Sequence, residues 1–298
     1  MGLVSTFKKG GVHPDDKKSL AKASVIERIP LPKELIVSMA QHLGVPATCL
    51  KKKGDVVVAG EKIGTASGFI SAEVHSPVDG VVKEIRKVRL ANGALADAVV
   101  ILPDREQKTT FTTKYDYSSL TSEELLASIK DLGIVGMGGA TFPTHVKLQI
   151  PVGKSVDAFV VNGVECEPYL TADYRVMMEK GKEVLEGIMI ISKIINPKRM
   201  IIGIELNKKD AIEHLEALIK EKNYPIEVMG LKMKYPQGDE KQLLKATINK
   251  EIPSGKLPID IGAVVCNLGT VNAIYEAISF HKPLIERVIT ISGEGIKN

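Results

Sequence analysis

The chain contains no tryptophan, few other aromatic residues and only three cysteines among its 298 residues. Cys49, Cys166 and Cys266 are far apart and odd in number, which fits a reducing cytoplasm and gives neither zinc nor iron–sulfur ligand spacing. The six histidines are equally scattered. The sequence therefore predicts no metal site, and any redox chemistry must come from a bound organic cofactor.

Long apolar runs are also missing, since none approaches the roughly 20 residues that a membrane-spanning helix needs. The N-terminal residues lack a signal-peptide pattern. A formal net charge of +4 is too small to argue for a nucleic-acid partner. With 44% hydrophobic and 26% charged residues, the composition predicts an ordinary globular protein with more than one domain.

Four segments differ in pattern along the chain. Residues 1–35 contain frequent proline and glycine, a pattern that predicts an extended arm. The pattern of residues 36–103 predicts short strands separated by Gly/Asp turns, as in a small all-β sandwich or barrel. Residues 104–118 are polar and aperiodic, which indicates a linker. From 119 to 298, strands alternate with helices, which predicts a Rossmann-like α/β domain around a largely parallel sheet.

Several elements of that last segment can be assigned individually. Thr121 and Glu124 form a capping box for a helix that ends at Gly133. A long helix is expected over 172–195, and a helix capped by Asn207 is expected up to residue 222. The expected strands are 159–162, 200–204, 226–229, 263–266 and 288–291.

The β segment resembles the biotinyl/lipoyl-domain family through the turns at 53–55 and 59–61 and the sequence Ser-Pro-Val-Asp-Gly-Val-Val at 76–82. Phe69 stands where that family carries its modified lysine. Without an amine there, lipoylation or biotinylation is excluded at that hairpin, and the module is expected to be structural or a docking surface.

A glycine-rich segment at 133–147 is the most informative feature. Gly136, Gly138 and Gly139, followed by Ala140, leave backbone amides bare for close approach by an anionic ligand. Phe142 adds an aromatic face and Lys147 a cation. The spacing matches neither the dinucleotide fingerprint nor the phosphate loop. The spacing alone is compatible with either a ligand-binding loop or a structural turn.

Three further polar segments follow or lie near expected strands, at 162–168, 235–240 and 267–270, where ligands of parallel sheets gather. Their carboxylates could serve acid–base catalysis, a divalent metal or sugar hydroxyls, and the last role is preferred. Tyr235 and Phe142 are equally compatible with core packing and with stacking on a ligand. The candidate residues of these segments are Asn162, Glu165, Glu167, Tyr235, Gly238, Asp239, Glu240, Asn267 and Thr270.

Taken together, in this order and spacing, the four segments resemble the flavin-binding subunit family of respiratory complex I, and more closely its relative RnfC of the ion-translocating ferredoxin:NAD oxidoreductases. The arm sequences Gly-Gly-Val-His-Pro at 10–14 and Ile-Pro-Leu-Pro at 29–32, with the lipoyl-like module, also match RnfC. The resemblance therefore covers nearly the whole chain.

The resemblance implies a bound FMN with NADH stacked on it, and no catalytic acid or base, because hydride transfer to flavin needs only orientation and electrostatics. Gly136, Gly138, Gly139 and Ala140 would wrap the cofactor, with Lys147 near its polar side. Phe142, Glu167 and Glu240 would face the nucleotide. The ribityl chain, phosphate or ring edge would be bonded by Asn162, Glu165, Gly238, Asn267 and Thr270.

Two departures qualify the resemblance. Complex I has Arg where Met137 stands and Gly where Thr141 stands, which fits RnfC better. RnfC proteins also continue into a tail holding two 4Fe-4S clusters, and that tail is expected to be absent here.

The implied function is an electron-transfer subunit, peripheral on the cytoplasmic side of the membrane, that partners membrane and ferredoxin-like subunits. The alternative is a cofactor-free scaffold or quinone-binding subunit, like the architecturally similar component of the sodium-translocating NADH:quinone reductase.

Overall fold

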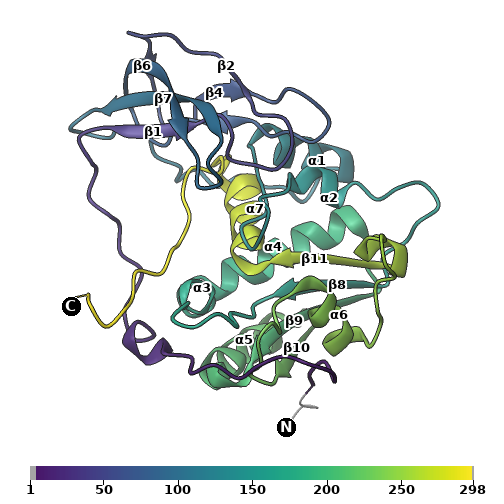
Figure 1. Ribbon diagram of the computed structural model, residues 1–298. Helices are drawn as coiled ribbons and strands as arrows, with labels where there is room; N and C mark the ends of the chain where they lie inside the picture. Colours follow the sequence, from purple (N-terminus) through teal and green to yellow (C-terminus); the bar gives the residue numbers. More distant parts are fainter. Residues whose placement is uncertain (1–4, 297–298) are drawn as a thin grey trace. The chain divides into compact units, whose positions relative to one another are not determined.

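A computed structural model describes residues 5–296 of the chain (Figure 1). By packing, the chain divides into two compact units. The α/β unit comprises the chain up to Ile26, Ile150–Asn272 and the residues from Val288 on. The β unit comprises Glu27–Gln149 and Ala273–Arg287.

The β unit contains two antiparallel sheets. One has the order β1-β7-β6-β3 and the other the order β2-β4-β5. The strands are β1 (Leu35–Ser38), β2 (Thr48–Cys49), β3 (Val56–Val57), β4 (Lys62–Thr65), β5 (Val74–His75), β6 (Gly80–Arg89) and β7 (Leu95–Pro103).

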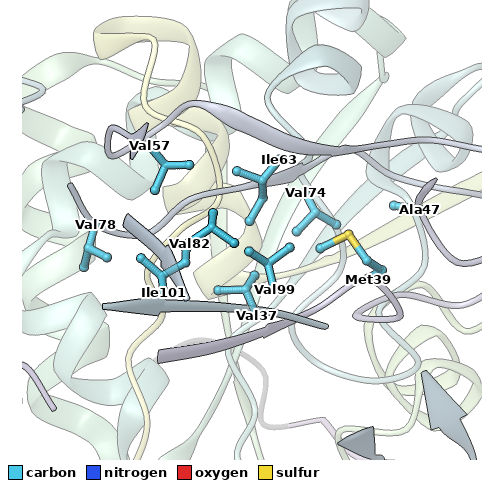
Figure 2. Packing of buried hydrophobic residues seen from close by; sticks show 10 residues of the cluster. All are labelled: Val37, Met39, Ala47, Val57, Ile63, Val74, Val78, Val82, Val99 and Ile101. Carbon is cyan, nitrogen blue, oxygen red and sulfur yellow. The ribbon is translucent and has the colours of Figure 1, made fainter. Parts of the chain in front are cut away.

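Small and β-branched side chains from both sheets meet in one buried cluster (Figure 2). Val82 of β6 and Val99 of β7 come from one sheet, and Ile63 of β4 and Val74 of β5 come from the other. Alternation along each strand places these residues on the inner faces. Their packing makes this unit a small β-sandwich, as the turn spacing predicts.

Asp79 connects the sandwich to the polar segment that follows it. Its carboxylate accepts hydrogen bonds from the backbone amides of Ala59 (2.7 Å), Lys108 (2.7 Å) and Thr109 (2.8 Å). Burial acts to raise the pKa of Asp79, but these hydrogen bonds prevail and lower it to about 2. Gly80 must lack a side chain, because a Cβ there would lie 2.3 Å from the Leu102 carbonyl oxygen.

One helix of the β unit precedes the glycine-rich segment, and a second begins within it. Helix α1 (Ser122–Asp131) begins at Thr121 with the expected capping box, in which Thr121 and Glu124 exchange hydrogen bonds. Helix α2 (Thr144–Leu148) is a short helix that the sequence pattern did not predict.

The α/β unit contains one sheet in the order β10-β9-β8-β11, with all three pairings parallel. The strands are β8 (Ala158–Asn162), β9 (Arg199–Glu205), β10 (Ile226–Leu231) and β11 (Ala263–Asn267). Strands β8, β9 and β11 are buried in nearly continuous apolar runs, because helices cover both faces, whereas the edge strand β10 is buried only at Ile226 and Leu231.

Helix α6 (Glu240–Ile248) packs Leu243 and Leu244 against Val160 and Val265 on one face of the sheet. The helices α3 (Ala172–Glu179), α4 (Gly181–Ile195) and α5 (Lys209–Lys222) pack against one another. Figure 1 shows α4 and α6 on opposite sides of β8. The fold class predicted from the sequence is confirmed by this parallel sheet together with the β-sandwich.

Three details of the sequence prediction are wrong. The helix expected over 172–195 is broken at Lys180, whose backbone (φ −129°, ψ 29°) is not helical and separates α3 from α4. Asn207 does not cap α5, since its side chain donates to Asp16 instead. Residues 288–291 form no strand, and Ile289 and Ile291 are exposed rather than paired in a sheet.

None of the helices between residues 5 and 296 is both long and apolar enough to cross a bilayer.

Candidate functional site

The glycine-rich segment forms a loop whose two ends are joined by hydrogen bonds. Gly136 donates its amide to the Phe142 carbonyl at 2.9 Å, and Thr144 donates to the Ile134 carbonyl at 3.0 Å. Gly133, at φ +66°, anchors the segment closely, because a Cβ there would lie 2.4 Å from the Glu73 carbonyl oxygen. The loop therefore projects from a fixed base.

The tip of this loop has the properties of an anion cradle. Gly138, Gly139 and Ala140 are exposed, and within residues 5–296 no hydrogen bond uses their amide N–H groups. A Cβ built on Gly139 meets no described atom within 4 Å, so the space beside it is open. Successive bare amides of this kind suit a phosphate or another anionic group. The loop is not folded shut against its own unit.

Thr141 lies beside these glycines in the left-handed region, at φ +51°, which is strained for a β-branched residue. Its carbonyl accepts a hydrogen bond from the Leu43 amide at 3.2 Å, and its hydroxyl donates to the Ala140 carbonyl at 2.7 Å. These bonds hold a conformation that glycine would adopt without strain. Phe142 and Lys147 are half-buried on the same loop and the helix after it.

In the α/β unit, the polar segments singled out by the sequence lie at the carboxyl edge of the sheet and form one hydrogen-bonded network. Asn162, at the end of β8, donates its Nδ2 to the Gly238 carbonyl at 2.9 Å and accepts the Val164 amide on Oδ1 at 3.1 Å. The Gly238 amide donates to the Sγ of Cys166 at 3.4 Å. The loops after β8 and β10 are thereby fastened together.

Glu165 is buried and its carboxylate is occupied inside the protein. It accepts the amides of Asp173 (2.8 Å) and Tyr174 (3.2 Å) in the first turn of α3, where the helix dipole favours an anion. Lys208 Nζ lies 3.6 Å from one of its oxygens. In this structure the Glu165 carboxylate therefore ties its loop to the start of α3 and to Lys208.

Asn267 joins the third segment to the same network. Its Nδ2 donates to the carboxylate of Asp173 at 2.7 Å, and its Oδ1 accepts the Thr270 amide at 3.2 Å in the first turn of α7 (Leu268–Phe280). Asp239 has a capping role in α6, because its side chain accepts the amides of Lys241 and Gln242.

Other candidate side chains face outward. Glu167 and Asp239 are exposed, Tyr235 is 41% exposed and Glu240 is half-buried. Tyr235 is thus not a core residue. Burial raises the pKa of the Cys166 thiol to about 11, so this cysteine is not poised as a nucleophile.

Comparison with known proteins identifies both parts of the chain. A family model described as the RnfC barrel sandwich hybrid domain matches residues 5–106, and one described as the Nuo51 FMN-binding domain matches residues 129–276. The chain is 43% identical over 297 residues to the C subunit of the proton-translocating ferredoxin:NAD(+) oxidoreductase complex of Clostridium ljungdahlii. The chain belongs to the RnfC family.

Two further RnfC relatives are similarly close. The chain is 41% identical over 293 residues to the C subunit of the Na(+)-translocating ferredoxin:NAD(+) oxidoreductase complex of Acetobacterium woodii, and 38% identical over 305 residues to that of the ion-translocating oxidoreductase complex of Pectobacterium carotovorum. These alignments cover 97–99% of this chain. The chain spans 64% of the Clostridium protein, 66% of the Acetobacterium protein and 40% of the Pectobacterium protein.

Sequence reasoning missed several residues that support the site of this RnfC chain. Asp173 links Glu165 to Asn267, and Lys208 lies between Glu165 and Glu205. Only the Lys208–Glu205 pair, three residues apart, is local; the other connections do not follow from spacing in the sequence. Lys18 of the arm was also missed. In the described part of the chain, no three His, Cys, Asp or Glu side chains gather in a way that could hold a metal ion.

Proposed function

We propose that this chain is the flavin- and NADH-binding part of an Rnf-type electron-transfer subunit. One observation carries the proposal: the segments that match the Nuo51 FMN-binding family include a loop with three bare amides and a carboxyl-edge network joining three polar loops. Bare amides and polar loops at the carboxyl edge of a parallel sheet are features that suit a phosphate-bearing nucleotide.

The residues present fit FMN in character. The amides of Gly138, Gly139 and Ala140 would take the phosphate or the polar edge of the ring, with Gly136 allowing close approach. Phe142 and Tyr235 offer aromatic faces, and Lys147 offers a positive charge near the loop. Bound FMN would supply the hydride acceptor for NADH, so the protein need only bind and orient the two.

At the carboxyl edge, Asn162, Glu165 and Asn267 would act mainly by holding Gly238, Thr270 and their loops in place, since their polar atoms are already bonded. Glu167 and Glu240 would face the NADH ribose. The proposal extends to two 4Fe-4S clusters in further sequence of the whole protein. Membrane and ferredoxin-like Rnf subunits would be its partners, on the cytoplasmic face of the membrane.

The test is a flavin titration with a matched pair of variants. The chain should quench FMN fluorescence on binding, and NADH should then bleach the flavin absorbance. Gly139→Trp should weaken FMN binding at least about 100-fold, because an indole fills the open space beside the loop. Gly295→Trp is the control, since its Cβ also meets no described atom within 4 Å.

A folded chain that neither binds FMN nor is bleached by NADH would overturn the proposal and favour the cofactor-free scaffold. Equal FMN binding by wild type and Gly139→Trp would place the flavin elsewhere.

Nucleotide preference gives a second prediction. The negative charges of Glu167 and Glu240 should repel the 2′-phosphate of NADPH. The kcat/KM for flavin reduction should therefore be at least about 10-fold higher with NADH than with NADPH. Glu167→Gln combined with Glu240→Gln should lower the ratio of the NADH to the NADPH kcat/KM and make that ratio less dependent on salt. Stopped-flow reduction of the flavin with each nucleotide measures the two kcat/KM values. Comparable rates with NADH and NADPH in the wild type would refute the assignment of these two carboxylates.

A further inference from the structure

Residues 10–18 of the N-terminal arm bind to the loop that contains Tyr235. Val12 and Tyr235 exchange two backbone hydrogen bonds, of 2.9 and 2.8 Å. Gly11 lies so close that a Cβ there would be 2.8 Å from the Tyr235 carbonyl oxygen and 2.6 Å from Cε of Lys234. Only glycine allows this approach, at φ +85°.

The same stretch of arm also binds to the loop that carries Glu165 and Glu167. The Asp16 carbonyl accepts the Tyr169 amide at 2.8 Å. Lys18 donates its ammonium to the carbonyl oxygens of Glu167 (3.0 Å) and Leu170 (2.6 Å). The Lys18 side chain is 5% exposed, and burying an ammonium is favourable only when such bonds compensate for lost hydration.

Arm and loops surround a common space. A cavity of about 90 Å³ is lined by His13 and Lys18 of the arm, by Glu165 and Cys166 of one loop, and by Tyr235 of the other. A segment of nine residues thus holds two of the three polar loops of the α/β unit and lines one side of the cavity between them.

We propose that residues 10–18 form a positioning element for nucleotide binding, with Gly11 and Lys18 as its positioning residues. The inference rests on the proposed function, because the arm would fix the positions of the Tyr235 and Glu167 loops that bind NADH. The arm bonds backbone atoms of both loops, through its own backbone at Val12 and Asp16 and through the Lys18 ammonium, so it fixes the paths of the loops without contributing chemistry.

Two matched pairs of variants test it. Gly11→Ala and Gly10→Ala both place alanine at a positive φ, but only the former collides with the Tyr235 loop, since a Cβ on Gly10 meets no described atom within 4 Å. Lys18→Met removes the buried donor, whereas Lys17→Met alters its half-buried neighbour, which pairs with Asp15.

Hydrogen exchange on the FMN-free chain is the first measurement. Gly11→Ala should speed exchange at the amides of Tyr235 and Gly238 about 10-fold or more, and Lys18→Met should do so at Tyr169 and Asp173. Gly10→Ala and Lys17→Met should leave these amides unchanged. Equal exchange in the test and control variants overturns the proposal, whether or not FMN binds.

Flavin reduction on the FMN-loaded chain is the second measurement. Both test variants should raise the KM for NADH about 10-fold while kcat stays within about 3-fold, as expected when an interaction binds ground state and transition state alike. A purely structural role would lower the amount of bleachable flavin at unchanged KM, and that result overturns the proposal. A wild-type chain that binds no FMN removes the proposed function, and the exchange data then decide on the arm by themselves.

Discussion

Replacing Lys208 by methionine is expected to lower the free energy of unfolding by about 3–5 kcal/mol. The Lys208 ammonium is 1% exposed and lies 3.3 Å from Glu205 and 3.6 Å from Glu165, both of which are also buried. Methionine preserves the length and packing of the side chain but leaves two carboxylates in a dry environment. Lys18 is the other buried ammonium near them. Urea unfolding followed by far-UV circular dichroism measures the loss.

A charge-removing second substitution distinguishes this effect from lost packing. Glu205→Gln added to Lys208→Met should recover part of the stability, because one uncompensated carboxylate disappears. Burial already raises the pKa of Glu205 above its ordinary value of 4.5, so the Glu205 part of the loss caused by Lys208→Met should shrink as pH falls toward about 4.5, because the folded chain then binds a proton on this carboxyl. Lys209→Met, at an exposed position, is the control. A loss below about 1 kcal/mol would contradict the assignment of this cluster as a buried ion network.

The fold could be predicted from the sequence wherever the signal is local. The capping box at Thr121 and the alternation of strands and helices after residue 119 depend on neighbours in the chain, and both are confirmed. One error arises from a long-range contact. Asn207 was expected as a cap, but Asp16 binds its side chain from 191 positions away. The break at Lys180 divides a segment that the sequence pattern presented as one helix.

The candidate site was predictable in its motifs but not in how its residues work. The glycine loop and the three carboxyl-edge segments stand out because polar residues beside glycine follow buried strands. Their direct roles remain predictions. The sequence could not show that the polar atoms of Asn162 and Glu165 form hydrogen bonds with other segments of the protein. Nor could it show that Lys18 binds the Glu167 loop. Buried polar groups find their partners through tertiary packing.

Stability should fall as pH drops from about 6.5 to about 4, by roughly 3 kcal/mol at most, because of His75. Burial is the main reason that the pKa of His75 is lowered to about 4, and the positive charge of Lys62 adds to it, while Asp131 and Glu73 oppose both. The unfolded chain takes up a proton near pH 6.5, whereas the folded chain does so only near pH 4. The stabilisation is therefore complete above pH 6.5 and is lost toward pH 4. Urea unfolding at pH 7.5, 5.5 and 4.5 measures this slope.

His75→Gln should flatten most of this pH dependence, leaving the smaller part due to His145, whose pKa burial also lowers. The control is His214→Gln, a half-buried histidine of the α/β unit, which should leave the slope as it is in the wild type.

His75 Nδ1 lies 3.2 Å from where a Cβ on Gly133 would be, directly beside the base of the glycine loop. Protonating His75 should therefore loosen that base first, and FMN affinity should fall over the same pH range in the wild type but not in His75→Gln. An unchanged slope in His75→Gln would mean that another group takes up the proton.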